Sequence, residues 1–213
     1  STGTRTFNHC ATAGAVQLPV NLNITAGTDT FTIVGSSALA GAFKSIDFSA
    51  FAGTQQTATG SGLFMLGDLT LASGMTCTAS TTRTYTFSAT SGTQIITSNG
   101  VTFGFNITEN GVGGTLSLAD TLTLVAGTVL TLTNGTFTAN NKNLSIPAFA
   151  SSKSNTRTIT MGSGTWTLTG TGTVWNTATT TNLTLNAGTS TIVVNDASAS
   201  SKTISASGTL NNL

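Results

Sequence analysis

Short apolar–polar–apolar triplets recur along the chain and are separated by Gly, Ser, Asn or Thr. Four clear cases are Leu144–Ile146, Ile159–Met161, Trp166–Leu168 and Leu183–Leu185. Alternation with a period of two over so few residues is typical of a short β-strand with one buried and one solvated face. We find no heptad pattern and no amphipathic helix longer than a turn or two. The pattern therefore predicts an all-β protein built of short strands.

The apolar positions fall into three series that share one period along the chain. The first series contains Leu22, Ile24, Ile46, Phe48, Leu69, Leu71, Ile95, Leu116, Leu118, Phe137, Ile159, Met161, Leu183, Leu185 and Ile204. The second contains Phe31, Ile33, Met75, Cys77, Val101, Phe103, Leu122, Leu124, Leu144, Ile146, Trp166, Leu168, Ile192, Val194 and Leu210. The third contains Leu39, Phe64, Tyr85, Phe87, Phe105, Ile107, Val129, Leu130, Phe149 and Val174. In the second series one turn, between Phe31 and Met75, has no clear apolar member.

Three strand series with a shared period indicate a β-solenoid, in which each turn of the chain contributes three strands. Each strand pairs in parallel with its equivalent one turn further on, and the inward side chains stack into a continuous core. We therefore expect a right-handed parallel β-helix with three strands per turn, about 22 residues per turn and roughly nine turns. A flatter cross-section and an antiparallel β-sandwich are the alternatives, because sandwiches also space short strands regularly.

The repeat also suggests how the domain is organised. We assign residues 1–15, which fit the period poorly, to a lead-in turn or N-terminal cap, and residues 16–213 to a single solenoid domain. The pattern at Thr209–Leu213 stops within a strand. We expect a chain that continues or that docks on a partner, and a last turn closed by its own loop fits equally well.

Composition narrows the classes of partner. Charged residues make up only 6% of the chain, and the formal net charge is +1, whereas ordinary globular domains contain roughly 25% charged residues. The Lys and Arg residues are scattered, so nucleic-acid binding has little electrostatic support. No stretch approaches the roughly 18 apolar residues of a membrane-spanning helix. We expect neither nucleic acid nor a membrane as a partner.

Residues with catalytic or metal-binding potential are few and dispersed. The acids are Asp29, Asp47, Asp68, Glu109, Asp120 and Asp196. Polysaccharide-cleaving solenoids need carboxylates paired at roughly 5 to 10 Å, and we interpret Asp47 and Asp68, one period apart, as a solvated surface pair. His9 and Cys10 lack further ligands, and Cys77 falls at an inward position. We therefore expect two free thiols, no metal, no cofactor and no enzymatic activity.

Outward rows of Thr raise a further alternative. Thr156–Thr160, Thr165–Thr169 and Thr131–Thr133 present hydroxyl groups at strand spacing, and flat arrays of Thr can order water, as in ice-binding solenoids. Such a face needs the same residue on nearly every turn, and Asp47 and Val193 interrupt the rows. Ice binding is therefore a minor alternative at this stage.

The segment Asn155–Trp175, with the sequence NTRTITMGSGTWTLTGTGTVW, resembles Thr/Gly-rich solenoid repeats of bacteriophage tail-fibre and virion surface proteins. It is also similar to stretches of bacterial adhesins. The resemblance is clear over the second half of the chain. The first half shares only the general character of these repeats. It implies an extracellular or virion-borne rod, which in phages is often a trimer. It carries over no catalytic residue.

These observations lead to a functional hypothesis. We expect a structural β-solenoid rod of a phage tail fibre or other extracellular surface appendage, which spaces or presents a binding tip. Its partners would be other copies, as a trimer or in a larger fibre. The alternatives are an adhesin or receptor-binding module for cell-surface glycans and a polysaccharide-degrading enzyme. Because aromatic rings stack on sugars, Trp175 and Tyr85 are the candidate ligand contacts, although both also fit the core.

Overall fold

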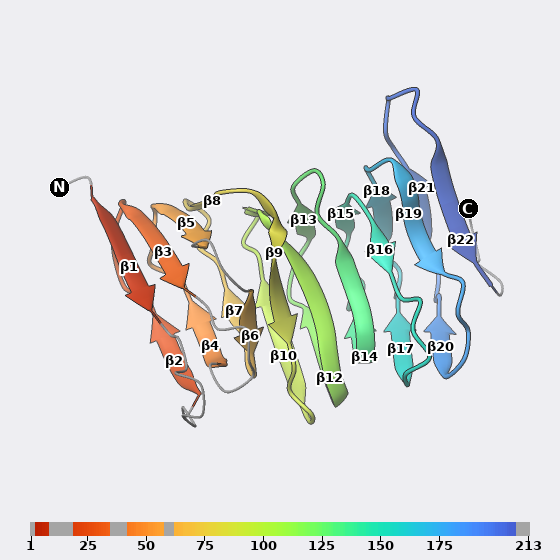
Figure 1. The fold of residues 1–213 in the computed structure, drawn as a ribbon, viewed down its shortest axis with the longest axis horizontal. Helices are drawn as coiled ribbons and strands as arrows, with labels where there is room; N and C mark the ends of the chain where they lie inside the picture. Colours follow the sequence, from red (N-terminus) through yellow and green to blue (C-terminus); the bar gives the residue numbers. More distant parts are fainter. Residues whose placement is uncertain (1–2, 9–18, 35–41, 58–61, 208–213) are drawn as a thin grey trace.

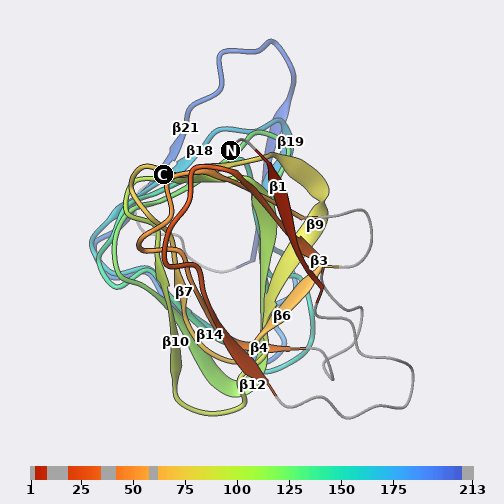
Figure 2. The same ribbon diagram turned by 90° about the vertical axis from the view of Figure 1, so that its left-hand side faces the viewer.

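The computed structural model describes residues 3–8, 19–34, 42–57 and 62–207. The chain coils about one long axis as an all-β solenoid (Figure 1). Seen from the end that holds β1, it turns clockwise as it recedes, so the coil is right-handed (Figure 2). The predicted fold class is thus confirmed. Within the described ranges, no helix is long and apolar enough to span a membrane.

One side of the solenoid, here called face A, is a column of parallel strands. Along the axis these are β1 (Thr4–Asn8), β3 (Thr30–Val34), β5 (Thr54–Thr57), β8 (Thr76–Cys77), β11 (Thr102–Phe103), β13 (Leu122–Leu124), β15 (Leu144–Ile146), β18 (Thr165–Leu168) and β21 (Thr191–Val194). Strands β1 to β8 form one sheet and β11 to β21 another, with a break between β8 and β11. The second apolar series of the sequence supplies most of the inward side chains of this column, but Val194 is 40% exposed and is not one of them.

The other two sides, faces B and C, share a continuous sheet. Face B contains β6 (Leu63–Met65), β9 (Ser80–Phe87), β16 (Phe149–Ala150), β19 (Gly172–Thr177) and β22 (Lys202–Ala206). Face C contains β2 (Val20–Asn23), β4 (Phe43–Asp47), β7 (Leu69–Thr70), β10 (Thr93–Thr97), β17 (Arg157–Thr160) and β20 (Leu183–Asn186). The long strands β12 (Phe105–Leu118) and β14 (Leu130–Thr138) cross from B to C, because each pairs with face B strands first and face C strands later.

The stack contains about seven turns, rather than the nine expected from the period. Face A has nine strands among the described residues, but the first and last coils are described only in part, since residues 9–18 and 208–213 lie outside the described ranges. Strand β1, which belongs to the segment assigned to a lead-in or cap, pairs in register with β3. At roughly 4.8 Å per strand, the column is about 40 Å long.

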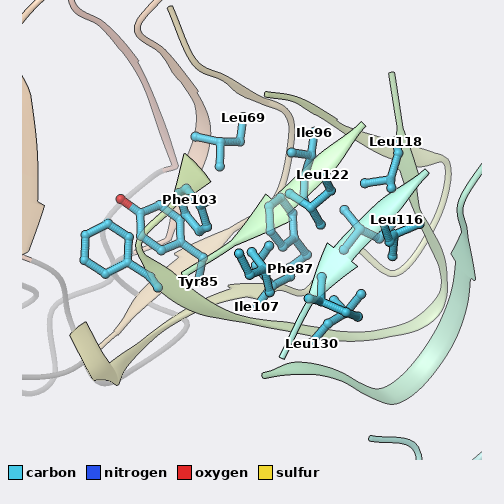
Figure 3. Close-up of a cluster of buried hydrophobic side chains, with 14 of the residues drawn as sticks. Leu69, Tyr85, Phe87, Ile96, Phe103, Ile107, Leu116, Leu118, Leu122 and Leu130 are labelled. Carbon is cyan, nitrogen blue, oxygen red and sulfur yellow. The ribbon is translucent and has the colours of Figure 1, made fainter. Parts of the chain in front are cut away.

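Strand alternation sends one apolar side chain after another into a single core. On face A, Leu144 pairs with Leu122 in one coil and with Trp166 in the next, and all three are buried. Figure 3 shows the middle of this core, where Phe103 from face A packs against Tyr85 from face B. Each fully buried side chain of this size contributes roughly 1.5 to 3 kcal/mol. The core is therefore the principal source of stability.

The structure corrects the sequence prediction at several positions. Ile96, not Ile95, points inward: Ile96 is 1% exposed and pairs with Leu69, whereas Ile95 is 38% exposed. The alternation alone does not separate two adjacent Ile residues, because either phase is apolar. Ile204 belongs to face B, where it pairs with Trp175, and not to the face C series.

Two further corrections concern the phase of single residues. Ile159 pairs with Leu185 rather than with Leu183. On β6, Leu63 and Met65 are buried while Phe64 is half-buried, so Phe64 is not the inward member of its coil. Leu39 and Leu210 lie outside the described residues.

The coil that lacked an apolar member is completed by a buried polar residue. Gln55 stands between Phe31 and Cys77 in the face A register and is fully buried. Its Nε2 donates a hydrogen bond of 2.9 Å to Tyr85 Oη, while its Oε1 has no partner. An amide at an inward position does not register as part of an apolar series, which explains the gap in the sequence pattern.

Candidate functional site

The two aromatic residues singled out as ligand contacts both lie in the core. Trp175 is 0% exposed, stacks on Phe149 with ring centroids 4.8 Å apart, and donates from Nε1 to Thr177 Oγ1. Tyr85 is 1% exposed and packs edge-on against Phe103. Stacking on a sugar requires an exposed ring face, which neither residue offers. Their role in this structure is packing.

Most of the aspartates serve the local backbone at the corners of the coil. Asp47 Oδ1 accepts from Ser49 N, and Asp68 Oδ1 accepts from Ile95 N. Asp120 accepts from two successive backbone N–H groups at the next corner. Each carboxylate thus satisfies backbone donors that a tight corner leaves without a strand partner. Asp47 and Asp68 serve different donors and form no joint acid–base arrangement.

Cys77 lies on face A and is half-buried as a free thiol. Burial raises the pKa of this thiol to about 11, so it stays protonated near neutral pH and is a poor nucleophile. His9 and Cys10 lie outside the described residues. In the part of the chain that the structure describes, no group of three or more His, Cys, Asp and Glu side chains is arranged to hold a metal.

A different set of residues gathers where face B turns into face C, here called the B–C corner. Buried polar side chains follow one another along the axis at this corner. They are Gln94, Glu109, Ser151, Arg157 and Thr177. Backbone carbonyl groups at a corner lose part of their strand pairing and need other partners, and buried side-chain donors serve them at two of these levels.

Gln94 fulfils that requirement on the first level. Its Nε2 donates to the carbonyl oxygens of Met65 (3.1 Å) and Gly67 (2.9 Å), and its Oε1 accepts from Ala89 N. All of its polar atoms therefore have partners although the residue is only 2% exposed. The amide links two consecutive coils across the corner.

Arg157 fulfils the same requirement further along the axis, with more bonds. Its guanidinium group donates to the carbonyl oxygens of Ser151, Asn155, Thr179 and Thr181 and to Ser151 Oγ. The residue is 0% exposed. Burial lowers the pKa of the guanidinium group, but an arginine retains its charge in proteins. A buried positive charge is thus held by four carbonyl groups and one hydroxyl group.

Glu109 lies between these two levels and is 0% exposed. It pairs with Phe87 and Leu132, so its carboxyl group occupies a core position. Oε1 accepts from Gly111 N at 3.0 Å, while Oε2 has no partner. Burial raises the pKa of this carboxyl group to about 8.

Sequence reasoning missed the role of Glu109 and Arg157, which it counted only as scattered charges. A signal was present: Glu109 follows Ile107 at a spacing of two, and Arg157 precedes Ile159 at the same spacing. Both charges therefore fall in the inward phase of their strands. The alternation could have placed them in the core.

Face C carries a regular array of small polar side chains on its outer surface. One row, stacked strand on strand, contains Thr93, Thr115, Thr136, Thr158 and Thr184. The row beside it contains Ile95, Ser117, Thr138, Thr160 and Asn186. The five coils of this array hold no charged residue in either row. Asp47 lies on face C in a coil outside this array, and Val193 lies on face A.

A shallow hollow of about 550 Å³ lies at the corner between faces A and B. Its lining includes Pro147, Thr169, Thr171, Thr173 and Asp196. Asp196 forms an ion pair of 2.9 Å with Lys202. The hollow therefore combines hydroxyl groups with a carboxylate that is already neutralised.

Comparison with known proteins adds no relationship to these observations. No protein-family model, curated protein or solved structure gives a significant match to this chain.

Proposed function

We propose that this chain is a structural rod segment of an extracellular or virion-borne appendage, such as a phage tail fibre. The observation that carries the proposal is the continuous parallel sheet of faces B and C from β2 to β22, around one apolar core. Each coil contacts its neighbours and little else, so rigidity extends along the axis. Uncharged Thr and Ser surfaces and the sequence resemblance of Asn155–Trp175 support a setting outside the cell.

The proposal includes assembly with other copies, as a trimer or in a larger fibre. Sedimentation equilibrium should give a mass of about three chains of 21.4 kDa, and immunogold labelling of the source particles or cells should mark projecting filaments. A monomeric mass at all concentrations would contradict assembly as a trimer. Gold label confined to the interior of the particle or cell would contradict the proposal of an external rod. Glycan arrays test the adhesin alternative, whose two candidate aromatic contacts, Trp175 and Tyr85, are buried.

The Thr array on face C favours a second candidate function, the binding of an ordered water lattice or ice. Parallel strands fix its rows at roughly 4.8 Å between coils and roughly 6.6 Å along each strand. Hydroxyl and methyl groups repeated on such a grid hold water at repeated positions. One row of the array repeats Thr in five consecutive coils, whereas the row beside it has Thr only at Thr138 and Thr160.

Replacing the middle of the array gives a direct test. We expect Thr158→Lys to abolish thermal hysteresis and ice-recrystallisation inhibition, because a mobile, strongly hydrated ammonium group disrupts the grid. The matched control is Thr167→Lys on face A, which should retain the wild-type values. The measurement is nanolitre osmometry. Absence of thermal hysteresis in the wild-type chain would eliminate the ice-binding function. It would not affect the proposal that the chain is a structural rod.

A further inference from the structure

The sequence contains three Asn–Gly peptides, at Asn99, Asn110 and Asn134. A peptide of this type can react with itself, because the backbone nitrogen of the glycine can attack the side-chain amide carbon of the asparagine and displace ammonia. Glycine has no side chain that hinders the approach. The reaction is favoured by a base near the glycine nitrogen, by a donor on the amide oxygen and by freedom of the local backbone.

At Asn110 the glycine nitrogen faces a carboxyl group. The backbone N–H of Gly111 donates a hydrogen bond of 3.0 Å to Glu109 Oε1, and Glu109 is 0% exposed. A carboxylate within hydrogen-bond distance of the proton to be removed has the geometry of a general base. Glu109 is therefore placed to take the proton from the nitrogen that attacks.

The side-chain amide of Asn110 is held from the next coil. Asn110 is exposed, and its Oδ1 accepts a hydrogen bond of 2.6 Å from Asn134 Nδ2. Attack on Cγ of Asn110 places negative charge on Oδ1, and a donor already aimed at this oxygen stabilises that charge. The attacking nitrogen and Cγ belong to the same dipeptide, so the reaction also gains from proximity.

The backbone after Asn110 lies outside the regular ladder. The pairing of β12 with β14 shifts on both sides of Asn110 and resumes at Thr115. Within this bulge Gly113 has a positive φ of 85°, and Val112 is 64% exposed. A bulge leaves residues without a ladder partner and permits dihedral angles that a regular strand does not. The Asn110–Gly111 peptide therefore has the freedom that ring closure requires.

The other two Asn–Gly peptides lack this combination. The backbone N–H of Gly135 donates to Thr156 O at 3.1 Å as part of the sheet. At Asn99 the side-chain Nδ2 donates to Leu71 O at 2.7 Å, and the backbone nitrogen donates to Asp120 Oδ2. Ring closure at either place would break these bonds. The two peptides are thus internal references for the first.

We propose that Asn110–Gly111 is a site of spontaneous covalent modification, at which Asn110 deamidates through a succinimide. Glu109 takes the N–H proton of Gly111, the nitrogen bonds to Cγ of Asn110, and the bond from Cγ to the amide nitrogen breaks. The proton passes to that amide nitrogen, which leaves as ammonia. Water then opens the ring at either carbonyl carbon and leaves aspartate or isoaspartate.

The charges around Glu109 do not neutralise it. Neither ion pair of the described residues includes Glu109. On the strands that pair with β12 and β14, the titratable residues are Arg83 and Tyr85 of β9 and Arg157 of β17. Burial raises the pKa of Glu109 to about 8. The carboxylate is therefore a stronger base than a solvated one, and it is ionised mainly above that pH.

The bulge also accommodates the products. Isoaspartate lengthens the main chain by a methylene group, but residues 111–114 lie between ladder positions, so the pairing on either side need not shift. Both products place a negative charge at an exposed position, where Asn134 Nδ2 remains available as a donor. The modified chain should therefore keep its coil and gain a surface charge.

Incubation of the whole native chain at about pH 9, where Glu109 is ionised, tests the proposal. Peptide mapping by mass spectrometry follows each Asn–Gly peptide, and electron-transfer fragmentation distinguishes isoaspartate from aspartate. We expect Asn110 to react at least about tenfold faster than Asn99 and Asn134. Asn99 and Asn110 share the sequence Asn–Gly–Val, so their rates should become similar in guanidinium chloride, where the fold is lost.

Three variants separate the parts of the site. Glu109→Gln keeps an oxygen that accepts from Gly111 but cannot take its proton, so it should slow the reaction at Asn110 at least about tenfold and leave Asn99 unchanged. Asn134→Ala removes the donor to Oδ1 and should slow it about fivefold. Asp68→Asn is the matched control and should react as the wild type.

Two results would contradict the proposal. One is a native wild-type chain in which Asn110 reacts no faster than Asn99. The other is a Glu109→Gln variant that has the wild-type circular dichroism spectrum and the wild-type rate at Asn110. If Glu109→Gln does not fold, the comparison of native and denatured wild-type chains still decides.

Discussion

Leu144→Asp should lower the free energy of unfolding by about 4 kcal/mol or more. Leu144 is 1% exposed and is packed between Leu122 and Trp166 in consecutive coils. The substitution removes apolar burial and places a carboxylate where no partner is available, and both effects destabilise the core. For a chain of this size the Tm should fall by roughly 10 °C. Chemical denaturation followed by tryptophan fluorescence reports the change, because Trp166 lies beside the substituted residue.

The matched control changes an outward residue of the neighbouring strand. Thr167→Ser on β18 removes one methyl group from a half-buried surface position, and its effect should stay within about 0.5 kcal/mol. An unfolding curve of Leu144→Asp that superimposes on that of Thr167→Ser would contradict the inward assignment of the face A column.

Arg157→Met should cost about 3 kcal/mol or more in unfolding free energy. The substitution keeps much of the side-chain volume but removes every donor from the carbonyl groups of Ser151, Asn155, Thr179 and Thr181. A buried acceptor without a partner costs about 1 to 3 kcal/mol. Water entering the corner would recover part of this loss, so the sum over all four carbonyl groups is an upper bound. Equilibrium denaturation in urea measures the difference.

Two further variants separate charge from geometry at Arg157. Arg157→Lys retains the positive charge but lacks the planar fork, so it should be intermediate in stability. Lys153→Met removes an exposed cation from the same corner and should be nearly neutral. If Arg157→Met were as stable as Lys153→Met, the guanidinium group would have no structural role.

The repeat could be predicted from the sequence because the alternation of apolar residues and the spacing between successive strands can both be read directly from the order of the residues. The register of Leu122, Leu144 and Trp166 follows directly from residues spaced one period apart. The prediction failed where a polar residue entered the core, as with Gln55, since an apolar pattern does not include a buried amide. It also failed at Ile95 and Ile96, where two neighbouring apolar residues fit opposite phases equally well.

The sequence did not place Trp175 and Tyr85 in the core because an aromatic ring suits a sugar-binding surface and a core equally well.

The break in face A between β8 and β11 affects how the molecule bears mechanical load. Above and below it, three walls of backbone hydrogen bonds tie successive coils together, but at this level faces B and C alone are continuous. A pull along the axis should separate the coils there first, because fewer backbone hydrogen bonds join them at this level. Extension of the chain should begin at this break and leave the coils on either side wound.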